Sequence, residues 1–351
     1  MATNLRQQLD ALIDLLTPSM EKAFRAAIDD IRSEIVLTEV VTMLERRDIE
    51  GAINALHIDP EAFRPLSDAV RQAFNQGGIL VTQNMPKLSD PAGARVVVRW
   101  DGENQRAEQI IRTKAAQLVT QVTEDTKDMI RERIAAGYEQ GQGPRTIATS
   151  IAGRIDRVTG KRVGGVIGLT AQLGRTVEKA RLSLSVGDIE GMKAYLKLSK
   201  RDKKYDARVR KAIEAGKPVD KETLEKITSQ LTARYINLRG ETIARTETMM
   251  AVSTSQHEAF QQGLDKAGRD ASLVTRTWRS AGDGRVRHSH MVMNGQKVVG
   301  MDLAFQAPSG AMLRYPGDTS LGAGAAEVIN CRCIAIYSFD FAEAYASSRG
   351  R

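Results

Sequence analysis

The sequence contains few cysteines and aromatic residues. Its 351 residues include two cysteines, and aromatic residues make up 5% of the chain. Two cysteines in a chain of this size do not indicate an oxidising compartment. A hydrophobic content of 42% allows a core, but one with few aromatic side chains. Such a composition suits helical bundles or extended helices better than sandwiches.

Long apolar runs and targeting signals are also missing. No run approaches the roughly 18 apolar residues that indicate a membrane-spanning helix, so we expect none. The opening residues, MATNLRQQLDALIDLL, show no basic segment followed by a hydrophobic core. We therefore expect no secretory signal.

Several motifs that would indicate an enzyme or a nucleic-acid reader are absent. The sequence has neither HExxH nor an HxE…CxxC arrangement, and the glycine-rich stretch 160–168 fits neither GxGxxG nor the P-loop. No zinc-finger or helix-turn-helix spacing is present. We therefore assign no catalytic residues, and we keep a metal-dependent hydrolase as the alternative function.

The most basic segment lies between Lys197 and Lys217. The whole chain has a formal charge of +8, from 51 basic and 43 acidic residues. This bias allows contact with a polyanion, and a cluster of cations is the usual footprint of phosphate binding. A solvated face without a partner is the other interpretation. The candidate DNA-contacting residues are Lys197, Lys200, Arg201, Lys203, Lys204, Arg208, Arg210 and Lys211.

Hydrophobic periodicity predicts a mainly α chain. Apolar residues at helical spacing indicate helices over 4–57, with an interruption at Thr17-Pro18-Ser19, and over 104–136 and 220–263. The run ARVVVRW is the one convincing strand of the first half. We expect an N-terminal helical region (1–100), a helical middle region with the basic segment (101–218), a terminal domain (219–341) and a tail (342–351). That terminal domain would combine a long helix with a small α+β unit and a short antiparallel sheet.

Three strands are predicted in the α+β unit. They are LVTRTWRS, GQKVVG with its flank, and EVINCRCIAIYSF, whose β-branched residues nearly alternate with others. Residues two apart on a strand point to the same face, so Cys331 and Cys333 are predicted to lie side by side. Their Cα atoms would be about 6.5–7 Å apart, at or beyond the limit for an unstrained disulfide.

The two cysteines can serve in two ways. Thiolates and imidazoles are the usual zinc ligands, so one hypothesis is a structural zinc held by Cys331, Cys333 and His290. Asp283 and His288 are further candidates, as ligands or as partners of an imidazole. The other hypothesis is a reduced, buried thiol pair, because cysteine is often plain apolar filler.

The C-terminal block resembles a known family. The pattern W…D.RVR.SH…NG……F…P.G….YPGD……INCRC, preceded by RGETIARTETMMA, is similar to the phage Mu F-like head morphogenesis proteins, also called minor head proteins. The resemblance covers about residues 220–337. The matching positions outside the cysteines are Arg245, Thr246, Glu247, Trp278, Asp283, Arg287, His290, Gly295, Pro316 and Asn330.

The resemblance implies a structural role. Such proteins are thought to enter the phage head in few copies near the portal and to contact portal, capsid or scaffold proteins. Some are thought to contact DNA or accompany it during ejection. The implied location is the virion, after assembly in the host cytoplasm. Eight residues (Arg245, Thr246, Glu247, Trp278, Asp283, Arg287, His290 and Asn330) would form a structural cluster in a domain with few apolar strands.

Overall fold

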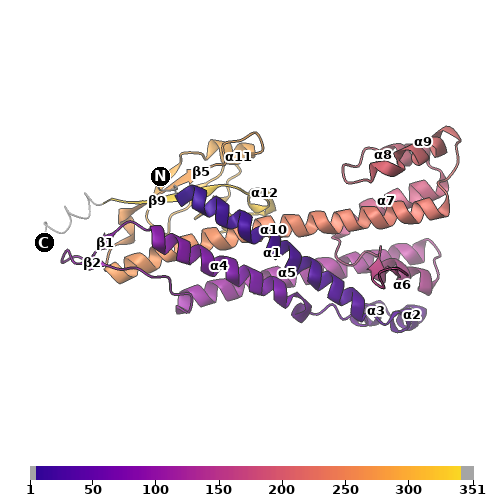
Figure 1. Ribbon diagram of the computed structural model, residues 1–351, viewed down its shortest axis with the longest axis horizontal. Helices are drawn as coiled ribbons and strands as arrows, with labels where there is room; N and C mark the ends of the chain where they lie inside the picture. Colours follow the sequence, from indigo (N-terminus) through magenta and orange to yellow (C-terminus); the bar gives the residue numbers. More distant parts are fainter. Residues whose placement is uncertain (1–4, 341–351) are drawn as a thin grey trace. The chain divides into compact units, whose positions relative to one another are not determined.

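Helices dominate the computed structural model, which describes residues 5–340 (Figure 1). The prediction of a mainly α chain with a small C-terminal antiparallel sheet is confirmed. The predicted tail, 342–351, lies outside the described residues. Over the described range, no helix combines the length and the apolar character that crossing a membrane requires.

The chain forms two compact units. The first is built from Met1–Glu21, Ser67–Ala116 and Thr242–Arg351, and the second from Lys22–Leu66 and Gln117–Glu241. The boundaries fall within four helices, so each of these contributes residues to both units. The four are α1 (Leu5–Glu34), α4 (Arg64–Asn84), α5 (Gln105–Glu139) and α10 (Lys221–Ala267).

The core of the first unit is formed between helices and a small sheet. In Figure 1 the sheet strands lie beside the C-terminal half of α10. Buried Val252 and Phe260 of α10 pack with Leu9 of α1, Val81 of α4 and Tyr337 of the sheet. Burial of such side chains contributes roughly 1.5–3 kcal/mol each. The sheet therefore depends on the helices for its hydrophobic partner.

The sheet has three antiparallel strands in the order β6-β5-β9. The central strand β5 (Val274–Arg279) pairs with β6 (Lys297–Val299) on one side and β9 (Ile334–Phe339) on the other. The short elements around it are η3 (Ala271–Leu273), α11 (His288–Val292), β7 (Phe305–Gln306), β8 (Met312–Leu313) and α12 (Ala325–Val328). Strands β1 (Leu88–Ser89) and β2 (Arg95–Val96) form a separate pair.

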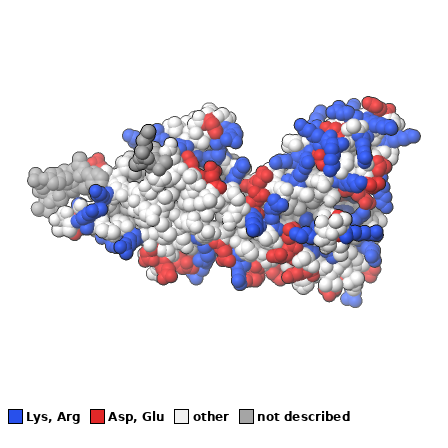
Figure 2. Space-filling view, viewed as in Figure 1, with Lys and Arg blue, Asp and Glu red and all other residues white. Residues whose placement is uncertain are grey.

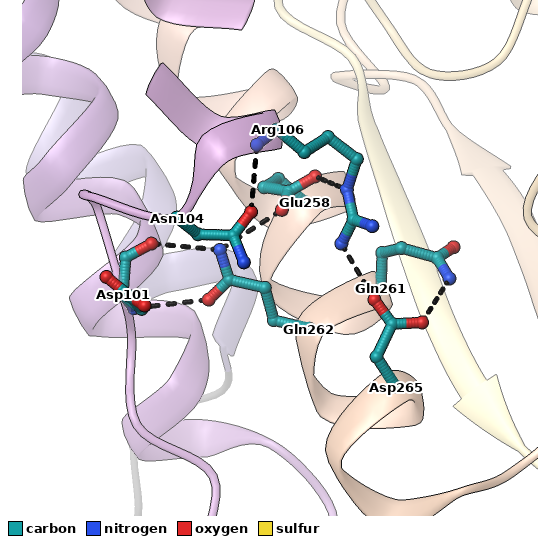
Figure 3. Close-up of polar contacts among 7 residues, drawn as sticks. All are labelled: Asp101, Asn104, Arg106, Glu258, Gln261, Gln262 and Asp265. Atoms are coloured by element: carbon teal, nitrogen blue, oxygen red, sulfur yellow. Dashed lines mark hydrogen bonds and ion pairs between the residues drawn. The ribbon is translucent and has the colours of Figure 1, made fainter. Parts of the chain in front are cut away.

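A polar network joins the start of α5 to α10 in this unit (Figure 3). Arg106 Nε donates to Glu258 Oε2 at 2.7 Å, and its Nη2 donates to Asp265 Oδ2 at 2.9 Å. Gln262 donates to the Asp101 carbonyl at 2.9 Å and accepts from the Asp101 N–H at 3.1 Å. Because the Glu258 side chain is only 3% exposed, Arg106 supplies the charge that allows its burial.

The second unit is helical with one short hairpin. Buried arginines hold the glycine-rich stretch: Arg32 Nη2 donates to the Ile167 carbonyl at 2.8 Å, and Arg239 Nη1 donates to that of Gly168 at 3.2 Å. This stretch is thus a structural turn against the helices. The unit's own elements are α2 (Leu37–Glu45), α3 (Ile49–Asn54), η1 (Pro60–Phe63), α6 (Pro144–Ala152), β3 (Arg154–Ile155), β4 (Arg162–Val163), α7 (Ala171–Val186), α8 (Ile189–Tyr195), η2 (Lys203–Tyr205) and α9 (Asp206–Glu214).

Three predicted elements have different bounds in the structure. Helix α1 continues through Pro18, where an interruption was expected, and Thr17 Oγ1 there donates to the Ile13 carbonyl at 2.7 Å. The strand predicted over 94–100 is ordered as a strand only at Arg95–Val96. The strand predicted over 327–339 begins at Ile334, because the residues before it form α12 and a segment without regular secondary structure.

Candidate functional site

Two buried cysteines and one buried histidine converge in the first unit. His290 lies on α11, and Cys331 and Cys333 lie just before β9. The Sγ atoms of Cys331 and Cys333 lie 3.5 and 3.3 Å from His290 Nδ1. The prediction that the cysteines belong to a strand is wrong, because β9 begins at Ile334 and residues 331–333 have no regular secondary structure. Both sulfurs nevertheless face the histidine, while Arg332 between them points to solvent.

A carboxylate lies on the other side of the histidine ring. Glu327 Oε2 is 3.0 Å from His290 Nε2. Two hydroxyls fix this carboxylate: Ser289 donates to Oε2 at 2.9 Å and Ser309 to Oε1 at 2.7 Å. Burial alone would raise the pKa of Glu327, but the two hydroxyl donors and the histidine lower it. The ring is therefore held between a carboxylate and two sulfurs.

The pKa values of the two thiols are shifted in opposite directions. A hydrogen bond with Cys333 lowers the pKa of Cys331, and the same contact raises the pKa of Cys333. Burial opposes the ionisation of both. The pair thus favours a single thiolate, with its charge next to His290.

The burial of the cluster bears on the hydrolase alternative. His290, Cys331 and Cys333 are 1%, 4% and 2% exposed. A thiol, an imidazole and a carboxylate in this order resemble the nucleophile, base and orienting group of a hydrolase. A substrate, however, needs access to the nucleophile. In this conformation the three side chains are buried, so a substrate cannot reach them. The arrangement therefore suits a structural role better than catalysis.

Trp278 packs against the histidine of the cluster. It is fully buried, and its ring meets His290 and Phe305 edge to face, with centroids 5.1 and 5.3 Å apart. Cys331 and Cys333 belong to the same apolar core. The neighbouring Arg287 donates to the carbonyls of Ala326 and Ile329, which lead into the cysteine segment. These contacts place the cysteine segment against α11.

The remaining predicted cluster residues divide into two groups. Thr246 Oγ1 accepts from the Asn330 N–H at 3.0 Å, which supports the left-handed backbone of Asn330 (φ 54°) beside Cys331. Glu247 lines a small cavity with Lys114. Arg245 is exposed. These contacts join Thr246 to the cluster but do not link Arg245 or Glu247 to it.

Two candidate metal ligands do not reach the sulfurs. Asp283 is exposed and accepts two hydrogen bonds from Arg332, which lower its pKa. His288 is exposed at the start of α11. Among the described residues, the group that can hold a metal consists of His290, Cys331 and Cys333, whose ligand atoms all lie within 4.8 Å of one another.

The structure also identifies residues that the sequence did not assign. Arg276 is fully buried on β5 and donates to the carbonyls of Gly300, Leu303 and Arg314. Asp318 is equally buried and accepts from the Arg314 N–H at 2.9 Å. In the sequence, Arg276 and Asp318 are charged residues among apolar or turn-forming neighbours. That pattern is equally typical of a solvent-exposed side chain, so it does not predict their burial.

The basic segment forms η2, α9 and the residues around them. Figure 2 shows Lys and Arg side chains gathered over α8 and α9. Not all of these charges are free. Arg201 pairs with Asp206 at 2.9 Å and Lys204 with Asp202 at 3.2 Å, whereas Arg208 donates to Thr223. Within the described part of this segment, the exposed cations with neither an ion pair nor a side-chain hydrogen bond are Lys197, Lys203, Arg210, Lys211 and Lys217.

The comparison with known families bears on the C-terminal part of the chain. Residues 203–336 match the model of a family described as Phage Mu protein F like protein. This confirms the predicted resemblance over the matched residues. The matched range includes α9, α10, the small sheet and the His/Cys cluster. No curated protein and no solved structure was found to match the chain.

Proposed function

We propose that this protein is a non-enzymatic minor component of the head of a tailed phage or prophage. It enters the virion in few copies near the portal and contacts portal, capsid or scaffold subunits. The observation that carries this proposal is the family match over 203–336. The buried His/Cys cluster agrees with it, because the site is built to fix a chain segment and offers no access to a substrate.

The same proposal includes contact with DNA through the basic surface over α8 and α9. We define this surface by the exposed cations that no carboxylate or side-chain hydrogen bond engages: Lys197, Lys203, Arg210, Lys211 and Lys217. Cations already paired with Asp202 or Asp206 gain less from a phosphate, because they would exchange one anion for another. Binding here would be independent of DNA sequence, since no element of the described segment presents a base-reading motif.

The partner contact is tested by co-purification. The full chain is co-expressed with the portal protein of the same phage, and separately with its major capsid and scaffold proteins. A stable complex that survives gel filtration with at least one of them is expected. If all three elute separately from the chain, and particles assembled in its presence contain none of it, the head-component proposal is wrong.

The DNA contact is tested by the salt dependence of binding. Replacing Lys197, Lys203, Arg210 and Lys211 with Gln should weaken binding to duplexes of any sequence. The slope of log K against log salt should become shallower by up to about 0.9 for each phosphate that the variant no longer neutralises. The control variant carries four Gln substitutions at exposed cations elsewhere, which are Lys87, Arg95, Arg99 and Lys297.

The control variant has the same net charge as the variant of the basic surface, but it keeps that surface intact. It should retain the wild-type slope. Equal slopes for the two variants would mean that net charge, and not this surface, sets the binding. The head-component proposal would survive that result, because its own test is complex formation.

A further inference from the structure

We propose that His290, Cys331 and Cys333 bind one thiophilic metal ion, with zinc the first choice. The ligand atoms would be His290 Nδ1 and the two Sγ atoms. All three come from one buried cluster that joins α11 to the segment before β9. This assignment goes beyond the head-assembly role and does not depend on it.

The spacing of the ligand atoms fits a metal ion. Zinc binds thiolate sulfur at about 2.3 Å and imidazole nitrogen at about 2.0–2.1 Å, so tetrahedral geometry sets S···N separations near 3.6 Å. The observed separations are 3.5 Å from Cys331 and 3.3 Å from Cys333. Both sulfurs approach the same ring nitrogen. A neutral imidazole nitrogen can exchange a proton with only one thiol at a time, whereas one ion satisfies all three atoms.

The ring is oriented as a metal-binding histidine is in many proteins. A ligand histidine usually directs its second nitrogen to a carboxylate or carbonyl, which fixes the tautomer and the ring plane. Here Glu327 lies 3.0 Å from Nε2, and Ser289 and Ser309 hold it in place. The Glu327 carboxylate near Nε2 favours the tautomer that carries the proton there, although the contact lacks hydrogen-bond geometry in this structure, and this leaves the Nδ1 lone pair free for the ion. Glu327 is thus a positioning residue.

The charge balance also fits. Two thiolates in an apolar core would be costly to bury without compensation. A divalent ion neutralises both, and a monovalent copper ion would leave one net negative charge near Arg287. The described residues supply three ligands, so the fourth position of a tetrahedral ion would fall to a small ligand such as water. The ion would cross-link positions 290 and 331, which are 41 residues apart in sequence.

The first test measures metal bound to the full chain. The protein is purified under reducing conditions, incubated with zinc, passed through a desalting column and analysed by elemental mass spectrometry. We expect about one zinc per chain, and a thiolate-to-metal charge-transfer band when cobalt replaces zinc. Cys331→Ser, Cys333→Ser and His290→Ala should each bind much less metal. His288→Ala is the matched control, because it removes a neighbouring but exposed histidine.

Two measurements keep the test decisive if a ligand variant misfolds. The wild-type chain is treated with a chelator, and its thermal unfolding should shift to lower temperature and recover on addition of zinc. Glu327→Gln should still bind one ion at saturating zinc, but with an affinity about 10–100-fold weaker, and Glu327→Asp should recover part of that loss. A merely structural role for Glu327 would change the melting temperature without changing the zinc affinity of the folded protein.

The results that overturn the proposal are equally specific. Wild-type protein with reduced thiols that binds well under one equivalent of zinc or copper would exclude the site. A cobalt complex without a charge-transfer band would show that the sulfurs are not ligands. Metal binding that His288→Ala abolishes and Cys333→Ser leaves intact would place the ion elsewhere. Copper(I) bound in place of zinc, with the same dependence on the three ligands, would support the site.

Discussion

The Arg332 guanidinium donates two hydrogen bonds, both 2.6 Å long, to the Asp283 carboxylate. Arg332 stands between the two buried cysteines, so this surface pair holds the cysteine segment from outside while the sulfurs face inward. The pair links the loop before α11 to the segment before β9. It also explains why Asp283, which the sequence offered as a metal ligand, is committed to an arginine.

The first prediction concerns this pair. The Arg332 contact lowers the pKa of Asp283 below its unfolded value of about 4, so its stabilising effect is present above that pH and is lost on acidification. Asp283→Asn should therefore lower the melting temperature near neutral pH, and the difference from wild type should vanish as the pH falls well below 4. Thermal unfolding across this pH range checks it, with Asp68→Asn as an exposed control. Loss of bound zinc in Asp283→Asn would contradict the assignment of this carboxylate to its arginine partners.

The second prediction concerns Arg276. Its guanidinium satisfies three carbonyls from the loops around β6 and β8, and its planar fork is what lets one side chain reach all three. Arg276→Lys keeps the charge but leaves at least one buried carbonyl without a donor. We expect a loss of about 2–4 kcal/mol in the free energy of unfolding, measured by denaturant titration. An effect below about 0.5 kcal/mol would mean that the loops adjust or that water replaces the missing donor.

Much of the helical architecture follows from the sequence. The long apolar periodicities predicted the helices that are now α5 and α10, because a stripe repeated over many turns is a strong signal. The interruption at Pro18 failed as a prediction, since tertiary packing of Leu16 and Met20, both buried, outweighs one lost backbone hydrogen bond. Of the strand expected over 94–100, only Arg95–Val96 pairs with another strand, because β-forming residues alone do not provide a partner for the rest.

The candidate site was predictable only in part. The CxC spacing predicted that both sulfurs face one way, and this held although the segment is not a strand. The choice between His288 and His290 required α11, which turns one inward and leaves the other exposed. Glu327 is not among the candidates from the sequence, because its contact with His290 Nε2 joins residues 37 apart in sequence. Such long-range contacts have no local pattern.

The third prediction concerns Trp278. Its indole fills the space beneath His290 and beside Phe305. Trp278→Ala should cost about 3–5 kcal/mol through reduced burial and a cavity, and Trp278→Phe clearly less. Trp100, the only other tryptophan in the sequence, lies in the same unit and reports its unfolding by fluorescence. Equal effects of the two substitutions would contradict this prediction, because Phe restores much of the volume that Ala removes.

The last prediction concerns Glu247 and pH. Glu247 lines a small cavity with Val70, Phe74 and Lys114. Burial raises the pKa of Glu247 to about 7, although the Lys114 charge opposes this. In the unfolded chain a glutamate titrates near pH 4.3, so the native state holds a proton that the unfolded state releases between those values. This contribution to stability is fully present below about pH 4.3 and is lost as the pH rises through 7.

Glu247→Gln should therefore change the free energy of unfolding more at alkaline pH than at acidic pH. The amide mimics the protonated carboxyl and has no charge to bury, so the variant should gain stability relative to wild type as the pH rises, by on the order of 2 kcal/mol at about pH 8.5. Denaturant titrations followed by tryptophan fluorescence at several pH values measure this, with exposed Glu103→Gln as the control. If Lys114 instead forms a favourable ion pair with an ionised Glu247, the variant will be less stable than wild type at alkaline pH. The sign of the difference at about pH 8.5 thus decides whether burial or the lysine dominates.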